Sequence, residues 1–284
     1  MTKKHFLLTL FTVISYAVFA QHILESPNKK IKVSINIGNT LSFSLNYRGD
    51  QVIKNANLNL VFNDQELYKS ENPELITKQV SDLVNPLIPY KHSEIKNQYN
   101  ELKFVFSNGF SVEFRAFNEG VVYRYVTTID EEVEVNEKAE LSFAGDLTTW
   151  LSQRKNFRGN YESTFDKGSL YHFPDTMQSY LPILMKDKRD NKILLLESDV
   201  VDYPHMYFKG SCSEKISALF PPFPLEVELK SDRASKVVKT ADYIAKTNGN
   251  RSFPWRVENI RLQSCKTASM QTGLLRIIRN IPNR

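Results

Sequence analysis

The chain has 284 residues but only ten glycines, five histidines and two cysteines, and these scarcities exclude several classes of protein. There is no P-loop and no dinucleotide-binding glycine motif. There is also no Gly-x-Ser-x-Gly elbow, and neither Cys212 nor Cys265 lies in a protease-like context. The histidines and cysteines lack the spacing of a zinc site. The residue patterns alone therefore identify no catalytic residue.

A leader is the first feature that is present. Residues 1–20 combine two early lysines, an apolar run and a small residue, Ala20, just before Gln21. This arrangement is typical of a secretory signal peptide, and the apolar run is shorter than the roughly 20 residues that span a bilayer. We therefore expect a periplasmic or secreted protein with no transmembrane segment after the signal is removed. In such an oxidising compartment the two cysteines could pair, although nothing in the sequence requires it.

The formal net charge of +5 is concentrated at the two ends of the chain. The leader lysines contribute +2 and the residues from Arg256 onward contribute a net +5, which leaves −2 for residues 21–255. A mildly acidic body offers no basic surface to a polyanion. We expect no nucleic-acid partner.

Alternation of apolar and polar residues with a period of two runs through the body of the chain. Ile31–Ile37 and Leu41–Tyr47 show it on either side of a Gly-Asn turn, which predicts a hairpin with one buried face. Phe110–Phe117 and Val121–Val126 repeat the pattern. Further strands are predicted at 58–62, 102–106, 141–143, 181–185, 192–196, 218–220, 225–229 and 237–239. Many short strands without helical periodicity indicate an all-β fold, an antiparallel β-sandwich over residues 21–257.

Residues 258–284 lose this alternation and become basic. Four apolar residues between Leu274 and Ile278 could form a short amphipathic helix suited to a membrane surface. Because so short a helix is marginal in water, we interpret the segment as an irregular basic tail.

Carboxylates are the remaining candidates for chemistry. The acidic run 130–132 is interpreted as a solvated loop, because neighbouring like charges repel one another. Glu197, Asp199 and Asp202 follow the buried-looking stretch 193–196, so they are either a solvated loop or part of a binding site. A strand end can present a carboxylate to a hard cation such as calcium, but such a cation needs six to eight oxygen ligands in total.

Several stretches, in this order and spacing, resemble the N-terminal domain of glycoside hydrolase family 97, the bacterial α-glucosidases and α-galactosidases. They are Ser26-Pro27 with Ile31–Val33, Phe110–Tyr125, Asn160–Glu162, Pro182–Leu184, Glu197–Met206 and Phe253–Arg256.

The resemblance implies a sandwich of the galactose-mutarotase-like supersandwich type, packed on a (β/α)8 barrel that carries the catalytic carboxylates. It implies a calcium ion in the active site, bound mainly by barrel glutamates and by one glutamate from the sandwich, which matches Glu197 here. Asp199 is not implied as a ligand. Asp202 and Tyr203 are expected to shape the turn, in which Pro204 fixes the backbone.

The barrel itself has no counterpart in this sequence. A (β/α)8 barrel takes about 250 residues, and only the short basic tail follows Val257. That tail does not resemble the sequence that follows this domain in the family. A truncated or frameshifted reading frame would produce such an end. We expect a domain of an exported α-glycosidase that is inactive alone. The missing barrel would bind the carbohydrate substrate and supply most of the calcium ligands.

Two other functions stay open at this stage. A stand-alone carbohydrate-binding module is suggested by aromatic residues that could stack on sugars: Trp150, Tyr161, Phe165, Tyr171, Phe173 and Tyr180. A protein-interaction sandwich is the other alternative. If a barrel is missing, an apolar face should be exposed, and Pro221–Pro224 and Phe253–Trp255 are the candidates for it.

Overall fold

The computed structural model describes residues 20–262, apart from residues 70, 87–92, 160 and 233. The leader up to residue 19 and the tail from residue 263, with Cys265, lie outside the described residues, whereas Cys212 is a free, exposed thiol. Between residues 20 and 262, those gaps aside, the structure contains no helix long and apolar enough to cross a membrane. The only helical element of the described chain is the 3₁₀ turn η1 (Leu170–His172).

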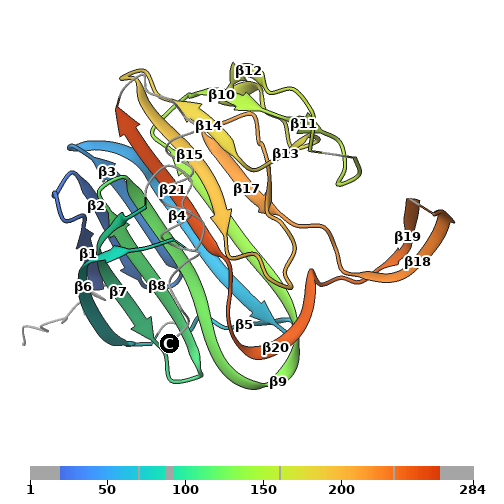
Figure 1. Cartoon of the computed structure of the whole chain (residues 1–284), viewed down its shortest axis with the longest axis horizontal. Coiled ribbons are helices and arrows are strands. Elements are labelled where there is room, and N and C mark those ends of the chain that lie inside the picture. Colours follow the sequence, from blue (N-terminus) through green and yellow to red (C-terminus); the bar gives the residue numbers. More distant parts are fainter. Residues whose placement is uncertain (1–19, 70, 87–92, 160, 233, 263–284) are drawn as a thin grey trace, which may run out of the picture.

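The first layer of the fold is an antiparallel sheet that begins at the N-terminal end of the described chain (Figure 1). Neighbouring strands pair in the order β1, β2, β3, β4, β9, β17, β16, β13, β11, and β5 extends the end of β4. Their bounds are β1 (Ala20–Glu25), β2 (Ile31–Ile37), β3 (Leu41–Tyr47), β4 (Asp50–Phe62), β5 (Gln65–Glu66), β9 (Gly120–Phe143), β11 (Gln153–Arg154), β13 (Gln178–Tyr180), β16 (Tyr207–Lys209) and β17 (Lys215–Leu219).

The second layer is also antiparallel and contains the last strand of the described chain. Its strands pair in the order β6, β7, β8, β9, β21, β15, β14, β10, β12, and β20 pairs with the middle of β9. Their bounds are β6 (Glu74–Val84), β7 (Ile95–Val105), β8 (Phe110–Phe117), β10 (Thr148–Leu151), β12 (Asp166–Ser169), β14 (Ile183–Lys186), β15 (Asn191–Ser198), β20 (Ala245–Ser252) and β21 (Trp255–Leu262).

Strand β9 belongs to both layers. Its first half pairs with β8 and β21, and its second half pairs with β4 and β17. The acidic run 130–132 lies between the halves and is exposed, as expected, but it is part of the strand and not a loop. The register shifts here opposite Gly249, where an added Cβ would lie only 2.7 Å from the carbonyl oxygen of Ile129. A bulge at a glycine therefore lets the strand continue while it bends.

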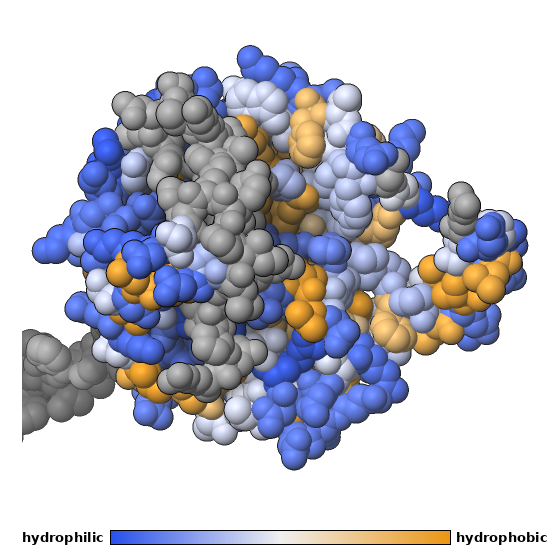
Figure 2. Space-filling view, in the orientation of Figure 1, coloured by the Kyte–Doolittle hydropathy of each residue, from blue (hydrophilic) through white to orange (hydrophobic). Residues whose placement is uncertain are grey.

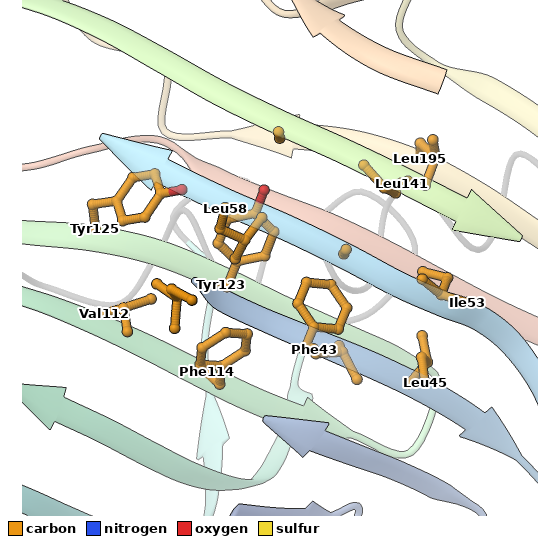
Figure 3. Packing of buried hydrophobic residues seen from close by; sticks show 14 of the residues in the cluster. Phe43, Leu45, Ile53, Leu58, Val112, Phe114, Tyr123, Tyr125, Leu141 and Leu195 are labelled. Atoms are coloured by element: carbon orange, nitrogen blue, oxygen red, sulfur yellow. The ribbon is translucent and has the colours of Figure 1, made fainter. Parts of the chain in front are cut away.

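The main core lies between the two layers and is rich in aromatic rings. Phe43 of β3, Phe114 of β8 and Tyr123 of β9 point toward one another (Figure 3), with ring centroids 5.6 to 5.8 Å apart. Every second residue of these strands faces inward, which is the alternation that the sequence shows. The predicted all-β antiparallel sandwich is confirmed.

Strand β21 continues to Leu262, five residues beyond the Val257 at which the sandwich was predicted to end. The sequence concealed this because Glu258 and Asn259 are polar yet 3% and 1% exposed. A strand that is buried on both faces loses the period-two pattern on which strand prediction depends.

A two-stranded arm projects from the sandwich (Figure 1) and consists of β18 (Pro224–Ser231) and β19 (Ala234–Thr240). Leu225, Val227 and Leu229 alternate along β18 and are exposed, and apolar residues are visible on the arm in Figure 2. The sequence predicted both strands but not their position. Their alternation is that of half-buried strands, yet no part of the described chain covers the apolar face, and Leu229 is 84% exposed.

The two segments proposed as an exposed face differ in burial. Pro221–Pro224 leads into the arm and is half-buried to exposed. The prediction for Phe253–Trp255 is wrong, because the rings of Phe253 and Trp255 are 1% and 2% exposed. Trp255 opens the buried strand β21, and Phe253 packs against Tyr203.

Core and arm should respond very differently to truncation. We expect Phe114→Ala to lower the free energy of unfolding by roughly 3–5 kcal/mol, because it leaves a cavity between the layers. Leu229→Ala should change it by less than about 0.5 kcal/mol, because the side chain is already in water. Urea unfolding followed by fluorescence measures both. A Leu229→Ala variant as unstable as Phe114→Ala would contradict this division.

Candidate functional site

The candidate site is built at the end of strand β15, where Glu197 is the last residue but one. β15 lies between β14 and β21, and residues 193–196 are buried on both faces of the sheet. Glu197 stands opposite Arg256 in the β15–β21 register. Its side chain is only 8% exposed, so this carboxylate belongs to the rim of the core and not to a solvated loop.

Arg256 connects this carboxylate to the interior. Its Nη1 donates to Glu197 Oε2 at 2.8 Å, while Nε and Nη2 donate to the two carboxylate oxygens of Glu137 at 2.9 and 2.6 Å. Burial alone would lower the pKa of Arg256, but the carboxylates of Glu137 and Glu197 raise it above its ordinary value. The guanidinium therefore stays charged and bridges two carboxylates by the strong, planar hydrogen bonds typical of arginine.

Tyr203 completes the buried side of the network. Its hydroxyl donates to Glu137 Oε2 at 3.1 Å. Burial, and then the charge of Glu137, raise the pKa of Tyr203 well above its ordinary value, so the phenol keeps the proton that it donates. The sequence placed Tyr203 in a turn, and the structure adds that its ring is 9% exposed and anchors that turn in the core.

The outer side of Glu197 faces residues of the following turn. The Met206 backbone N–H donates to Oε2 at 3.1 Å, and His205 Nδ1 lies 2.7 Å from Oε1. The hydrogen bond with Glu197 raises the pKa of His205, whose side chain is 60% exposed. Asp199 and Asp202 adopt positive φ values of 59° and 48°, which bring the chain back toward the strand end. Asp202 thus shapes the turn as expected.

The residues around Glu197 do not by themselves make a metal site. Within the described ranges, no group of three or more Asp, Glu, His or Cys side chains is placed to hold a cation. Both oxygens of Glu197 already have hydrogen-bonding partners, and calcium requires six to eight oxygens. The site thus holds one carboxylate near the surface, and a calcium ion bound there would need its other ligands from elsewhere.

A glycosidase pair cannot be built from these two carboxylates. Glycoside hydrolysis needs two carboxyl groups that flank the scissile bond. The Glu137 side chain is 0% exposed and shares Arg256 with Glu197, so it cannot contact a substrate. Among the described residues of this site, Glu137 and Glu197 therefore do not form a catalytic pair.

Glu137 and Arg256 were both missed by sequence reasoning. Glu137 lies in an acid-rich stretch, and Arg256 was counted with the basic tail. One signal was available: Arg256 is flanked by Trp255 and Val257, and an arginine within an apolar strand needs a buried partner.

The loop aromatics are only partly available to a ligand. Phe173 and Tyr180 are buried, whereas Tyr161, Phe165 and Tyr171 are 54%, 43% and 42% exposed. The Tyr161 hydroxyl is 2.9 Å from that of Tyr207, and its ring packs edge-on against Tyr180.

Glu258 is a buried carboxyl with no salt-bridge partner among the described residues. It is 3% exposed, its Oε2 lacks a hydrogen-bond partner, and burial raises its pKa to about 8. The side chain is therefore neutral at pH 7.

The family model described as glycosyl-hydrolase 97 N-terminal matches residues 24–264. A retaining alpha-galactosidase of Bacteroides thetaiotaomicron is 28% identical over 267 residues, which cover 88% of this chain. The chain spans 40% of the length of that relative.

Two solved structures share the fold. A glycoside hydrolase family 97 enzyme from Pseudoalteromonas sp. strain K8, solved with acarbose, aligns with a TM-score of 0.71 at 20% identity over 84% of this chain and 35% of its own. A beta-arabinopyranosidase aligns with a TM-score of 0.69 at 16% identity over 84% of this chain and 40% of its own.

Stability should depend on pH through Glu258. Its folded pKa of about 8 exceeds the ordinary 4.5, so its contribution is complete below about 4.5 and is lost as the pH rises through about 8. Linkage gives a maximum loss of roughly 5 kcal/mol. Urea unfolding at about pH 5 and about pH 9 should show that the free energy of unfolding falls strongly with pH in the native chain and less in Glu258→Gln. Equal slopes in the two proteins would contradict the assignment.

Proposed function

Because this chain belongs to the glycosyl-hydrolase 97 N-terminal family, we propose that it is the β-sandwich domain of an exported, calcium-dependent α-glycosidase that acts in oligosaccharide or polysaccharide breakdown. The relatives support the reaction class: one is named a retaining alpha-galactosidase, and another was solved with acarbose. The observation that carries the proposal is the Glu197 carboxylate, fixed at a strand end by Arg256 and close to the surface.

The proposed role of Glu197 is to supply a single carboxylate ligand to the calcium ion. An ion shared between two domains needs a carboxylate whose position does not depend on the ion, and Glu197 is held by hydrogen bonds from Arg256 and Met206. The other calcium ligands and the catalytic carboxylates would lie in a (β/α)8 barrel, which takes about 250 residues. Calcium binding by this chain alone should be weak, because one carboxylate cannot replace the ion's water shell.

Export is proposed from the leader. Residues 1–20 have the charge, length and cleavage-site pattern of a signal peptide, and removal before Gln21 would leave β1 almost intact. The protein would then work in the periplasm or outside the cell, where the substrates of a polysaccharide-degrading system are found.

A sugar-binding module without catalysis is the second candidate. It is favoured by the exposed rings of Tyr161, Phe165 and Tyr171, which could stack on a sugar. Binding in that case should depend on those rings and not on Glu197.

Turnover distinguishes a domain from a complete enzyme. We expect the purified chain to release no p-nitrophenol above a buffer blank from p-nitrophenyl α-glucoside or α-galactoside, with or without added calcium. The reason is that the two carboxylates of the candidate site, Glu137 and Glu197, cannot flank a glycosidic bond, because the Glu137 side chain is fully buried. Steady turnover by the native chain that is lost in Glu197→Gln would contradict the placement of the catalytic groups outside this domain.

A further inference from the structure

A groove of about 740 Å³ lies along the outer face of the second layer, on the side of the sheet that faces away from the main core. We call it the outer groove. Strands β6, β7, β8 and β9 form its floor, and β20 and the start of β21 close one side. Its lining side chains include Lys78, Asn97, Tyr99, Arg115, Arg124 and Trp255. A volume of this size is typical of a small-molecule site.

Cross-strand register arranges the charges of the outer groove in rows. Glu101 stands opposite Arg115, and Glu113 stands between Lys103 and Arg124. The ion-pair distances are 2.5 Å for Arg115–Glu101, 3.0 Å for Lys103–Glu113 and 2.8 Å for Arg124–Glu113. Because most of these groups are largely shielded from solvent, the rows hold the floor of the groove in one geometry.

Aromatic rings fix the guanidinium groups in place. The Arg115 guanidinium lies 4.8 Å from the Tyr99 ring centroid and 4.5 Å from that of Trp255. Arg124 lies 4.3 Å from the same Trp255 ring. The planar donor group of Arg115 is therefore prevented from turning away to solvent.

Two polar atoms of this rigid floor are buried and have no hydrogen-bond partner. They are Nη1 of Arg115 and Oδ1 of Asn97, in side chains that are 7% and 3% exposed. Asn97 and Tyr99 point to the same side of β7, so the free acceptor and the ring that supports Arg115 both line the outer groove. A buried donor and a buried acceptor without partners cost free energy, and a site that keeps both is prepared for a ligand that supplies both.

The lining indicates which class of ligand fits. Five basic and four acidic side chains line the outer groove: Lys78, Lys103, Arg115, Arg124 and Arg251, with Asp82, Glu101, Glu113 and Asp199. The four carboxylates would repel a polyanion, and an apolar ligand would leave the charged groups without polar partners. An oligosaccharide carries several hydroxyl groups, each of which can donate and accept, so different hydroxyls could satisfy Asn97 and Arg115.

We propose that the outer groove binds a neutral oligosaccharide through Asn97 and Arg115. The proposal does not depend on Glu197, whose side chain points to the opposite face of the sheet with Arg256. It also differs from binding at the exposed rings of Tyr161, Phe165 and Tyr171, because its polar contacts come from strands β7 and β8. The chain would thus hold a carbohydrate whether or not a catalytic barrel accompanies it.

Amide chemical-shift mapping tests this directly. The ¹⁵N-labelled chain is titrated with maltotriose, with melibiose and, as an anionic control, with inorganic phosphate. We expect one or both sugars to shift amides of the outer groove on β7 and β8, and phosphate to leave them unchanged. Shifts with phosphate alone, or with no sugar at saturating concentration, would overturn the proposal.

Substitutions separate binding from folding. Arg115→Lys is the direct test but leaves Glu101 weakly paired and could unfold the chain, so Asn97→Leu is the decisive variant. It removes the unpaired amide oxygen without a large change in volume, and should keep or raise the melting temperature while weakening sugar binding at least roughly tenfold. Leu229→Ala, on the exposed arm, is the control and should bind as the native chain does. Tyr161→Ala distinguishes the outer groove from the loop rings and should not weaken binding in the groove. Unchanged affinity in Asn97→Leu, or loss in Tyr161→Ala alone, would refute the assignment.

Discussion

The arrangement of this domain depends on one buried ion pair, between Arg256 and Glu137. Glu137 lies on the half of β9 that pairs with β4 in the first layer, and Arg256 lies on β21 in the second. Their two hydrogen bonds, of 2.9 and 2.6 Å, therefore cross the interior and join the layers. The third contact of the guanidinium holds Glu197 at the end of β15. Burying two charges is costly, so the pair is better understood as fixing the position of Glu197 than as adding stability.

Strand β21 contributes residues to both proposed sites, which lie on opposite faces of the second layer. Adjacent residues of a strand point to opposite sides of the sheet, so Arg256 enters the core while Trp255 forms part of the outer groove. The carboxylate proposed for calcium and the groove proposed for a sugar are thus specified by neighbouring residues on a single strand. Because β21 pairs with both β9 and β15, it cannot move without disturbing both of its neighbours in the second layer.

Much of the fold could be predicted from the sequence, because half-buried strands keep their alternation. The hairpin 31–47 and the strand 110–117 appear with the bounds expected for them. The position of Glu197 at a strand end was also correct. The apolar neighbours of Arg256 signal a buried partner, but its pairing with Glu137 could not be found, because an ion pair between residues 119 apart in the chain leaves no local pattern. The arm shows the opposite difficulty: Leu225, Val227 and Leu229 alternate like a buried strand, and only the three-dimensional structure shows that no described residue covers them.

The most direct test of the central claim is a double-mutant cycle on the buried pair, with unfolding free energies measured for Arg256→Met, Glu137→Leu and the double variant. Removal of Glu137 leaves the buried Arg256 with Glu197 alone, and removal of Arg256 leaves the buried Glu137 with only the Tyr203 hydroxyl, so each should cost roughly 3–5 kcal/mol. Removal of both should cost far less than the sum, which corresponds to a coupling energy of at least about 2 kcal/mol. If the two single effects instead add to within about 0.5 kcal/mol, the two layers and Glu197 are not joined through this pair.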